Sequence, residues 1–166
     1  MTLRWRVECG EWKTYEEQRE ATRSLLCGLL GSAVVVEHDD RGAPFLPLSP
    51  ELTLSISHCR KAVAVAVSAE GPVGIDVESR RKVSELLMER VCAPEELAEI
   101  RVAADPTMAF LQLWTRKEAV LQMRRTGIQG FGSMVRALED KDVIIKDLSC
   151  DLPDVVASLA TCKTRQ

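Results

Sequence analysis

The sequence predicts an α+β fold of two similar halves, each with a helix packed on a small antiparallel sheet. Three observations favour this class. Short segments alternate apolar and polar residues with the period of half-buried strands. Longer segments have helical spacing of apolar residues and begin at capping residues. The order strand, helix, strands occurs on both sides of the turn at residues 71–74. We therefore expect an N-terminal half over residues 1–72 and a C-terminal half over residues 73–166.

The first half is expected to begin with a strand over residues 3–9, where apolar residues alternate with charged ones. Thr14, followed three residues later by Glu17, has the pattern of a capping box and predicts a helix from Tyr15 to Leu30 that ends at Gly31. Further strands are expected at residues 33–37, 52–57 and 62–67, and a loop rich in proline and glycine over residues 38–50.

The second half is expected to open with a strand over residues 73–78 and to continue with helical pieces near residues 84–91 and 94–104. Asp105 caps a long helix that has Pro106 at its first position, runs to about Arg125 and stops at Gly127. Three strands are then expected, over residues 133–138, 143–148 and 155–160.

Composition excludes several classes of protein. The chain has 166 residues, of which 46% are hydrophobic and 28% charged, and its net charge of −3 lacks the basic excess of a nucleic-acid binder. No apolar run reaches the roughly 18 residues that span a bilayer, and the N-terminus lacks the apolar region of a signal peptide. The six cysteines form no CxxC pair, so we expect reduced thiols. These features predict a cytoplasmic protein without nucleic-acid or membrane partners.

Two carboxylates share one face of a predicted strand. Asp76 and Glu78 are two residues apart, so their side chains leave the strand on the same side. They repel each other unless a cation lies between them, and Mg²⁺ prefers such oxygen ligands. Taken alone, the same pattern also fits a solvated strand face.

Two further features carry candidate chemistry. Glu118 and Lys117 lie at opposite margins of the apolar face of the long helix, where they fit either a site or a surface ion pair. Ser57 and His58 end a strand, where the imidazole can donate to a phosphate or cap the turn.

Together these segments resemble the 4′-phosphopantetheinyl transferases, and specifically the surfactin-type class built as a single-chain pseudo-dimer. The family pattern is roughly G-K-P, then N-x-S-H-S, then G-[IV]-D-x-E, then W-[ST]-x-K-E-[AS]-x-x-K. The matching segments are residues 42–44, 54–58, 73–78 and 114–121, and Glu118 follows Asp76 by 42 residues, as the pattern expects. The resemblance implies two halves related by pseudo-two-fold symmetry in a monomer.

The resemblance also implies a reaction and a set of roles. Coenzyme A donates its phosphopantetheine arm to a serine of an acyl or peptidyl carrier protein, and 3′,5′-ADP leaves. The metal ligands for Mg²⁺ would be Asp76, Glu78 and Glu118. Glu118 would also accept the serine proton, and Lys117 would steady the phosphate charge. Contacts to coenzyme A would come from Ser57 and His58 at the phosphates and Ser24 at the adenosine end.

The sequence departs from the family pattern at two cationic positions. Ala43 stands where the pattern has the lysine of G-K-P, and Arg41 is the expected substitute. Gln122 stands where the pattern has the last lysine, one turn after Glu118, and Arg124 or Arg125 could compensate. Two alternatives to an active transferase therefore stay open: a homologue that binds coenzyme A or a carrier protein without transfer, and an interaction domain whose motifs are coincidental.

Overall fold

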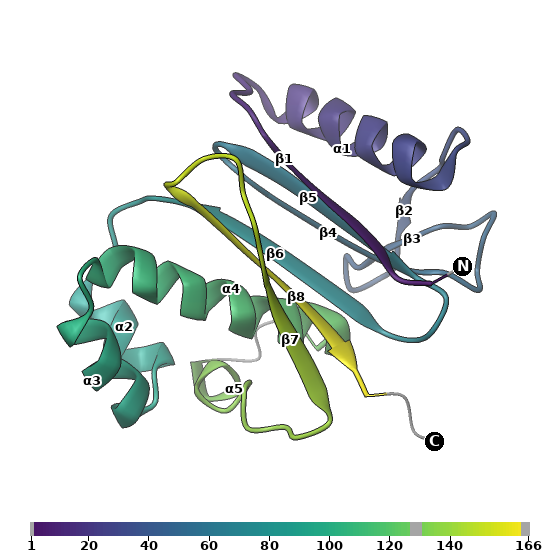
Figure 1. The fold of residues 1–166 in the computed structure, drawn as a ribbon. Coiled ribbons are helices and arrows are strands. Elements are labelled where there is room, and N and C mark those ends of the chain that lie inside the picture. The colour runs from purple at the N-terminus through teal and green to yellow at the C-terminus, as the bar shows by residue number, and fades with distance from the viewer. Residues whose placement is uncertain (1, 127–130, 164–166) are drawn as a thin grey trace.

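The computed structural model describes residues 2–126 and 131–163 (Figure 1). The elements, in chain order, are β1 (Arg4–Cys9), α1 (Tyr15–Leu30), β2 (Glu37–His38), β3 (Pro44–Phe45), β4 (Thr53–Cys59), β5 (Ala62–Ser68), β6 (Val73–Ser79), α2 (Glu85–Val91), α3 (Pro94–Val102), α4 (Pro106–Arg124), α5 (Phe131–Val135), β7 (Val143–Leu148) and β8 (Val155–Cys162).

Two three-stranded antiparallel sheets have the same strand order. In the first sheet β5 lies between β1 and β4, and in the second β8 lies between β6 and β7. In each sheet the central strand is the last in sequence, and it pairs with the strand just before it and with the strand that precedes the long helix. The short strands β2 and β3 pair separately. Small antiparallel sheets with helices confirm the predicted α+β class.

The sheets pack face to face, and a long helix covers each outer face (Figure 1). The alanines of β5 meet Ile75, Val77 and Leu159 of the second sheet in a core between the two sheets. On the outer face of the first sheet, Leu26 and Leu29 of α1 pack against valines of β5. On the outer face of the second sheet, α4 forms the largest cluster, with Phe110 and Leu111 fully buried.

The helix boundaries follow the capping signals. Thr14 accepts a hydrogen bond from the backbone of Glu17, whose side chain accepts one from the backbone of Thr14, so the predicted capping box is present. Gly31 ends α1 with φ 72°, a left-handed conformation that glycine adopts without strain. Asp105 accepts from Met108 and caps α4, whose last residue is Arg124. The predicted stop at Gly127 lies outside the described residues.

Two predicted strands are wrong. Residues 131–135, which overlap the predicted strand at 133–138, form the short helix α5, where Met134 is fully buried against the α4 cluster. Residues 33–36 form no strand, and pairing in that region is limited to β2 with β3. Both segments are apolar because they pack on helices, and an apolar run alone does not distinguish a strand from other buried chain. Within residues 2–126 and 131–163, no helix is long and apolar enough to cross a membrane.

Candidate active site

Strand β6 and helix α4 lie unusually close, and Gly74 permits this. A Cβ atom at Gly74 would lie 1.8 Å from the carbonyl oxygen of Ala119 and 2.6 Å from the backbone nitrogen of Met123. No side chain fits there, so the glycine lets the backbone of α4 rest directly on the strand. The close contact brings residues of α4 next to the outward-facing side of β6.

Two serine hydroxyls link β4 to β6, which belong to different sheets. Ser55 Oγ accepts from the backbone nitrogen of Ile75 at 3.0 Å, and Ser57 Oγ accepts from that of Val77 at 3.3 Å. Each hydroxyl then donates its own hydrogen. Ser57 donates to Oδ1 of Asp76 at 2.7 Å, within a buried environment. The sequence predicts a phosphate contact for Ser57, whereas the structure places its hydroxyl on this carboxylate.

Three carboxylates lie near one another where β6 faces α4. Asp76 is 7% exposed, and Glu118 is half-buried on the helix. Burial raises the pKa of Asp76 well above its usual range, the hydrogen bond from Ser57 opposes this, and the negative charges of Glu118 and Glu78 raise it further. Burial also raises the pKa of Glu118, and the charge of Glu78 adds to that effect. The sequence-predicted acidic residues are therefore close enough for the charge of one to raise the pKa of another.

Two buried oxygens of this group, Oδ2 of Asp76 and Oε1 of Glu118, accept no hydrogen bond from residues 2–126 and 131–163. A buried acceptor without a partner is costly, and a carboxylate more so, unless a cation or a proton satisfies it. In the described part of the chain, the carboxylates do not themselves form a ready three-ligand metal cluster. The two orphan oxygens nevertheless fit a hard divalent cation.

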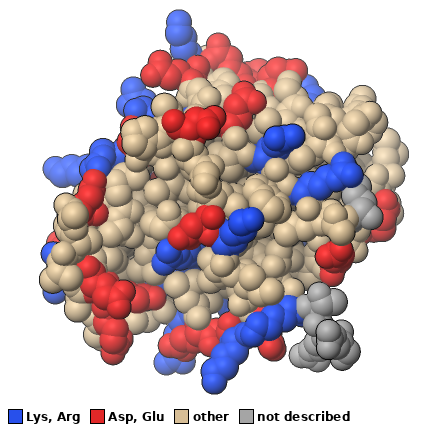
Figure 2. Space-filling model, in the orientation of Figure 1, with Lys and Arg blue, Asp and Glu red and all other residues tan. Residues whose placement is uncertain are grey.

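Glu78 has a cationic neighbour at the edge of the site. The guanidinium of Arg81 donates to both carboxylate oxygens, at 3.1 and 3.4 Å, and it also lies 5.7 Å from the ring centroid of Trp114. Arg80, next in the same basic run, pairs with Asp105. Figure 2 shows basic and acidic side chains interspersed over one face of the molecule. The basic run at residues 80–82 is therefore largely compensated by acidic partners.

Lys117 points away from the three carboxylates. Its ammonium donates to the carbonyl of Val91 at 2.8 Å and to Oε2 of Glu96 at 2.6 Å, with a longer contact of 3.4 Å to the carbonyl of Val135. The side chain is fully buried. Because the three acceptors lie on α2, α3 and α5, the ammonium group of Lys117 links α4 to these three helices. The structure does not bring it to the clefts described below.

A cleft of about 370 Å³ lies between the end of α4 and the loop before β3, and Gln122, which donates to Asp76, lines it. We call it the α4 cleft, and its lining includes Arg41, Ala43, Ser55, Gln122 and Arg125. Arg125 stands in the left-handed conformation that ends α4, with φ 53°. Gln122 and Arg41 thus lie at one cleft, and the helix end brings Arg125 to it.

A second cleft, of about 430 Å³, adjoins the first and shares Gly42, Pro44 and Ile56 with it. We call it the α1 cleft. His58 is exposed there and meets the ring of Tyr15 edge-on, with 5.5 Å between centroids.

The α1 cleft also contains residues that the sequence analysis missed. Arg19, Arg23 and His38 line it, whereas Ser24 is exposed on α1 and is not among the lining residues. Tyr15, Arg19 and Arg23 recur every four residues, so helical spacing was the signal that marks this face of α1.

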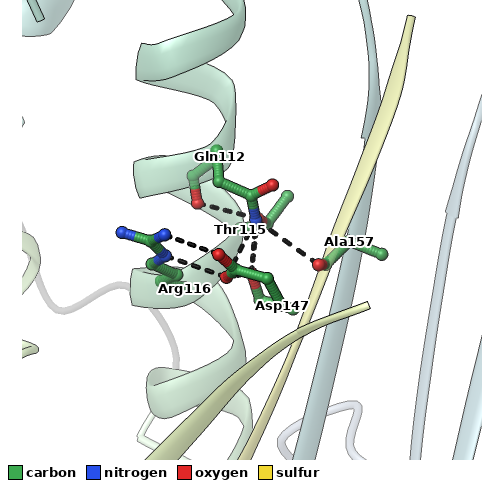
Figure 3. Close-up of polar contacts among 6 residues, drawn as sticks. Gln112, Thr115, Arg116, Asp147 and Ala157 are labelled. Carbon is green, nitrogen blue, oxygen red and sulfur yellow. Dashed lines mark hydrogen bonds and ion pairs between the residues drawn. The ribbon is translucent and has the colours of Figure 1, made fainter. Parts of the chain in front are cut away.

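A second polar network on α4 lies apart from the carboxylates (Figure 3). The amide of Gln112 donates to Asp147 Oδ1 at 3.1 Å and to the carbonyl of Ala157 at 3.4 Å. Arg116 donates to both oxygens of Asp147, at 2.9 and 2.5 Å. These contacts join α4 to β7 and β8, so they hold the helix against the second sheet.

Comparisons with known proteins identify relatives of the chain. A sequence model of the 4′-phosphopantetheinyl transferase superfamily matches residues 72–151, the segment that holds all three carboxylates. The chain is 29% identical over 119 residues to a 4′-phosphopantetheinyl transferase of Bacillus subtilis, a match over 68% of this chain and 50% of that protein. It is 32% identical over 120 residues to 4′-phosphopantetheinyl transferase HetI of Nostoc sp., over 66% of this chain and 51% of the relative. It is 34% identical over 109 residues to 4′-phosphopantetheinyl transferase AcpT of Escherichia coli K12, over 63% and 55%. The chain thus spans about half the length of the curated relatives it matches.

Proposed function

We propose that the chain, of which residues 72–151 match a model of the 4′-phosphopantetheinyl transferase superfamily, transfers the phosphopantetheine arm of coenzyme A to a serine of an acyl or peptidyl carrier protein. The observation that carries the proposal is the set of carboxylates Asp76, Glu78 and Glu118, two of whose buried oxygens accept no hydrogen bond from the described residues. Two adjoining clefts accompany it, and Gln122, which donates to Asp76, lines one of them. We also propose that the chain belongs to the surfactin-type class and is a monomer. Its halves, residues 1–72 and 73–166, would be related by pseudo-two-fold symmetry.

The clefts suit an elongated anionic substrate. The α1 cleft combines apolar residues with Arg19, Arg23 and two histidines, which suits a nucleotide with a phosphate group. The α4 cleft adds the cationic side chains of Arg41 and Arg125. Coenzyme A, laid across the shared residues, would place its adenosine end at α1 and its diphosphate near α4.

The three carboxylates would bind the metal ion, and one of them would also accept a proton. Asp76, Glu78 and Glu118 would hold Mg²⁺, and when bound the ion supplies neutralisation of charge on the diphosphate. Glu118 would accept the proton of the carrier serine, since burial makes it more basic than an exposed glutamate. The serine oxygen then forms a bond to the phosphorus that carries the pantetheine arm. The bond from that phosphorus to 3′,5′-ADP breaks, and the nucleotide leaves with the electron pair.

The test is a carrier-modification assay. The protein is mixed with an apo carrier protein, coenzyme A and Mg²⁺, and the carrier is weighed by mass spectrometry. We expect a mass gain of one phosphopantetheine group that disappears with Asp76→Asn. Carriers that stay unmodified, together with a thermal shift on adding coenzyme A, would instead support a homologue that binds without transfer. That alternative is favoured by Ala43 and Gln122, where the family pattern has lysines.

A further inference from the structure

The two carboxylate oxygens of Asp76 differ in the hydrogen bonds they accept. Oδ1 receives the hydroxyl of Ser57 at 2.7 Å and the amide of Gln122, through Nε2, at 3.4 Å. Oδ2 is equally buried and receives nothing. Two donors on one oxygen fix the rotation of the carboxylate, so the other oxygen is left in a defined direction for a ligand.

The amide of Gln122 is itself held in one orientation. Its Oε1 accepts from Ser55 Oγ at 2.8 Å. The ionised carboxylate of Asp76 can only accept, so the amide nitrogen of Gln122 faces it and the amide oxygen is left toward Ser55, which also accepts from the backbone nitrogen of Ile75 at 3.0 Å. The hydroxyl hydrogen therefore points to Gln122, the amide oxygen turns toward Ser55, and the amide nitrogen turns toward Asp76. The hydrogen bonds thus form a continuous path from the backbone of Ile75 on β6 to Ser55 on β4, then to Gln122 on α4, and back to Asp76 on β6. Every donor along this path meets an acceptor.

We propose that Gln122 is a positioning residue that orients Asp76 for a divalent cation, and that Ser55 acts on Asp76 through Gln122. The inference rests on the proposed function, because it assigns a purpose to the free oxygen of Asp76. An amide at this place orients the carboxylate and adds no charge, so the negative charge of Asp76 stays available to the cation. A glutamine here therefore works only with a partner such as Ser55 that fixes which end of the amide faces the carboxylate.

The experiment measures Mn²⁺ binding by the full chain in the presence of coenzyme A, with free Mn²⁺ followed by electron paramagnetic resonance. Gln122→Met removes both polar atoms at similar length, and Gln122→Asn keeps an amide that is too short to join Ser55 and Asp76. Each variant should weaken Mn²⁺ binding by about three- to tenfold, the effect of one ordinary hydrogen bond, because the contact of Gln122 with Asp76 is long at 3.4 Å. The Mg²⁺ concentration for half-maximal transfer should rise in parallel.

A double-mutant cycle tests the role of Ser55. If Ser55 acts through Gln122, Ser55→Ala with Gln122→Met should bind Mn²⁺ no more weakly than Gln122→Met alone. Additive losses would overturn that part of the proposal.

Gln112→Met is the matched control. It removes an amide on the same helix that donates to Asp147 and Ser158, so it should lower thermal stability and leave Mn²⁺ affinity unchanged. Wild-type affinity in both Gln122→Met and Gln122→Asn would overturn the positioning role. A wild-type protein that neither binds Mn²⁺ nor modifies a carrier would instead overturn the proposed function, and this inference with it.

Discussion

Lys117 and Glu96 form an ion pair with 2.6 Å between Nζ and Oε2, and the lysine side chain is fully buried. Lys117 directly precedes Glu118, yet the two serve different parts of the molecule, since successive residues of a helix point about 100° apart. The glutamate joins the carboxylates at β6, and the lysine anchors α4 to α3. The ion pair thus holds in place the helix that carries Glu118.

Lys117→Met should destabilise the protein strongly. Removing one partner of a buried ion pair leaves an uncompensated charge, which costs about 3–5 kcal/mol. The free energy of unfolding in urea measures this loss, and adding Glu96→Gln should recover part of it. A variant of native stability with a raised KM for coenzyme A would contradict the anchoring role and favour the phosphate contact that the sequence suggests.

Gly74→Ala should destabilise the fold because α4 leaves no room for a methyl group at this position. The added carbon would lie 1.8 Å from the carbonyl of Ala119, so the helix has to move away from β6. Overpacking costs about 1–3 kcal/mol, and here both colliding groups are backbone. The matched control is Gly28→Ala on α1, where nothing lies within 4 Å, and it should stabilise the protein by about 0.5–1 kcal/mol. Equal effects of the two substitutions in denaturant unfolding would show that the close approach is wrong.

Arg125 and Arg124 should differ in their effect on coenzyme A. Arg125 lines the α4 cleft, whereas Arg124 pairs with Asp140 at 2.7 Å and is absent from the cleft lining. One lost charge-assisted contact costs about 1.5–3 kcal/mol, so Arg125→Gln should raise the KM for coenzyme A about tenfold or more. Arg124→Gln should leave that KM near the wild-type value. Steady-state kinetics of the two variants measures the KM for coenzyme A. A raised KM in Arg124→Gln alone would exclude Arg125 as the cation that replaces the lysine of the family pattern.

Asp76→Asn should abolish transfer and raise the thermal stability of the metal-free protein at neutral pH. The carboxylate is buried with an orphan oxygen, so burial and its acidic neighbours hold its pKa high, and ionisation at neutral pH opposes folding. Thermal unfolding in EDTA shows the gain, and Mg²⁺ with coenzyme A should stabilise the wild type but not the variant. A large loss of stability in Asp76→Asn would mean that the residue is structural.

The ion pair of Arg116 with Asp147 predicts a pH-dependent contribution to stability. The hydrogen bonds from Arg116 hold the pKa of Asp147 below its usual range. The stabilisation is therefore present above the unfolded pKa of about 4 and is lost as the pH falls through the lower folded value. Both side chains are about 40% exposed, so the contribution is at most about 1 kcal/mol. The difference in unfolding free energy between the wild type and Arg116→Met should thus be largest near pH 7 and should fall toward zero once the pH drops below the lowered pKa of Asp147. A difference that is constant with pH would assign the loss to packing.

The sequence by itself determined the local features. Thr14, Glu17 and Asp105 mark helix starts through hydrogen bonds within one turn, and the alternation along residues 73–78 is confirmed as a strand. Asp76 and Glu78 share a face because neighbouring positions on a strand alternate. Each of these depends on contacts between residues close in sequence.

Only the tertiary structure decided which residues meet across elements. The hydroxyls of Ser55 and Ser57 face β6 because the two sheets stack, and Gln122 reaches both Ser55 and Asp76 because Gly74 lets α4 lie directly on the strand. The direction of Lys117 likewise depends on where α3 packs. Such contacts join residues at least 19 positions apart. They are set by the packing of whole elements, on which the local pattern of residues carries no information.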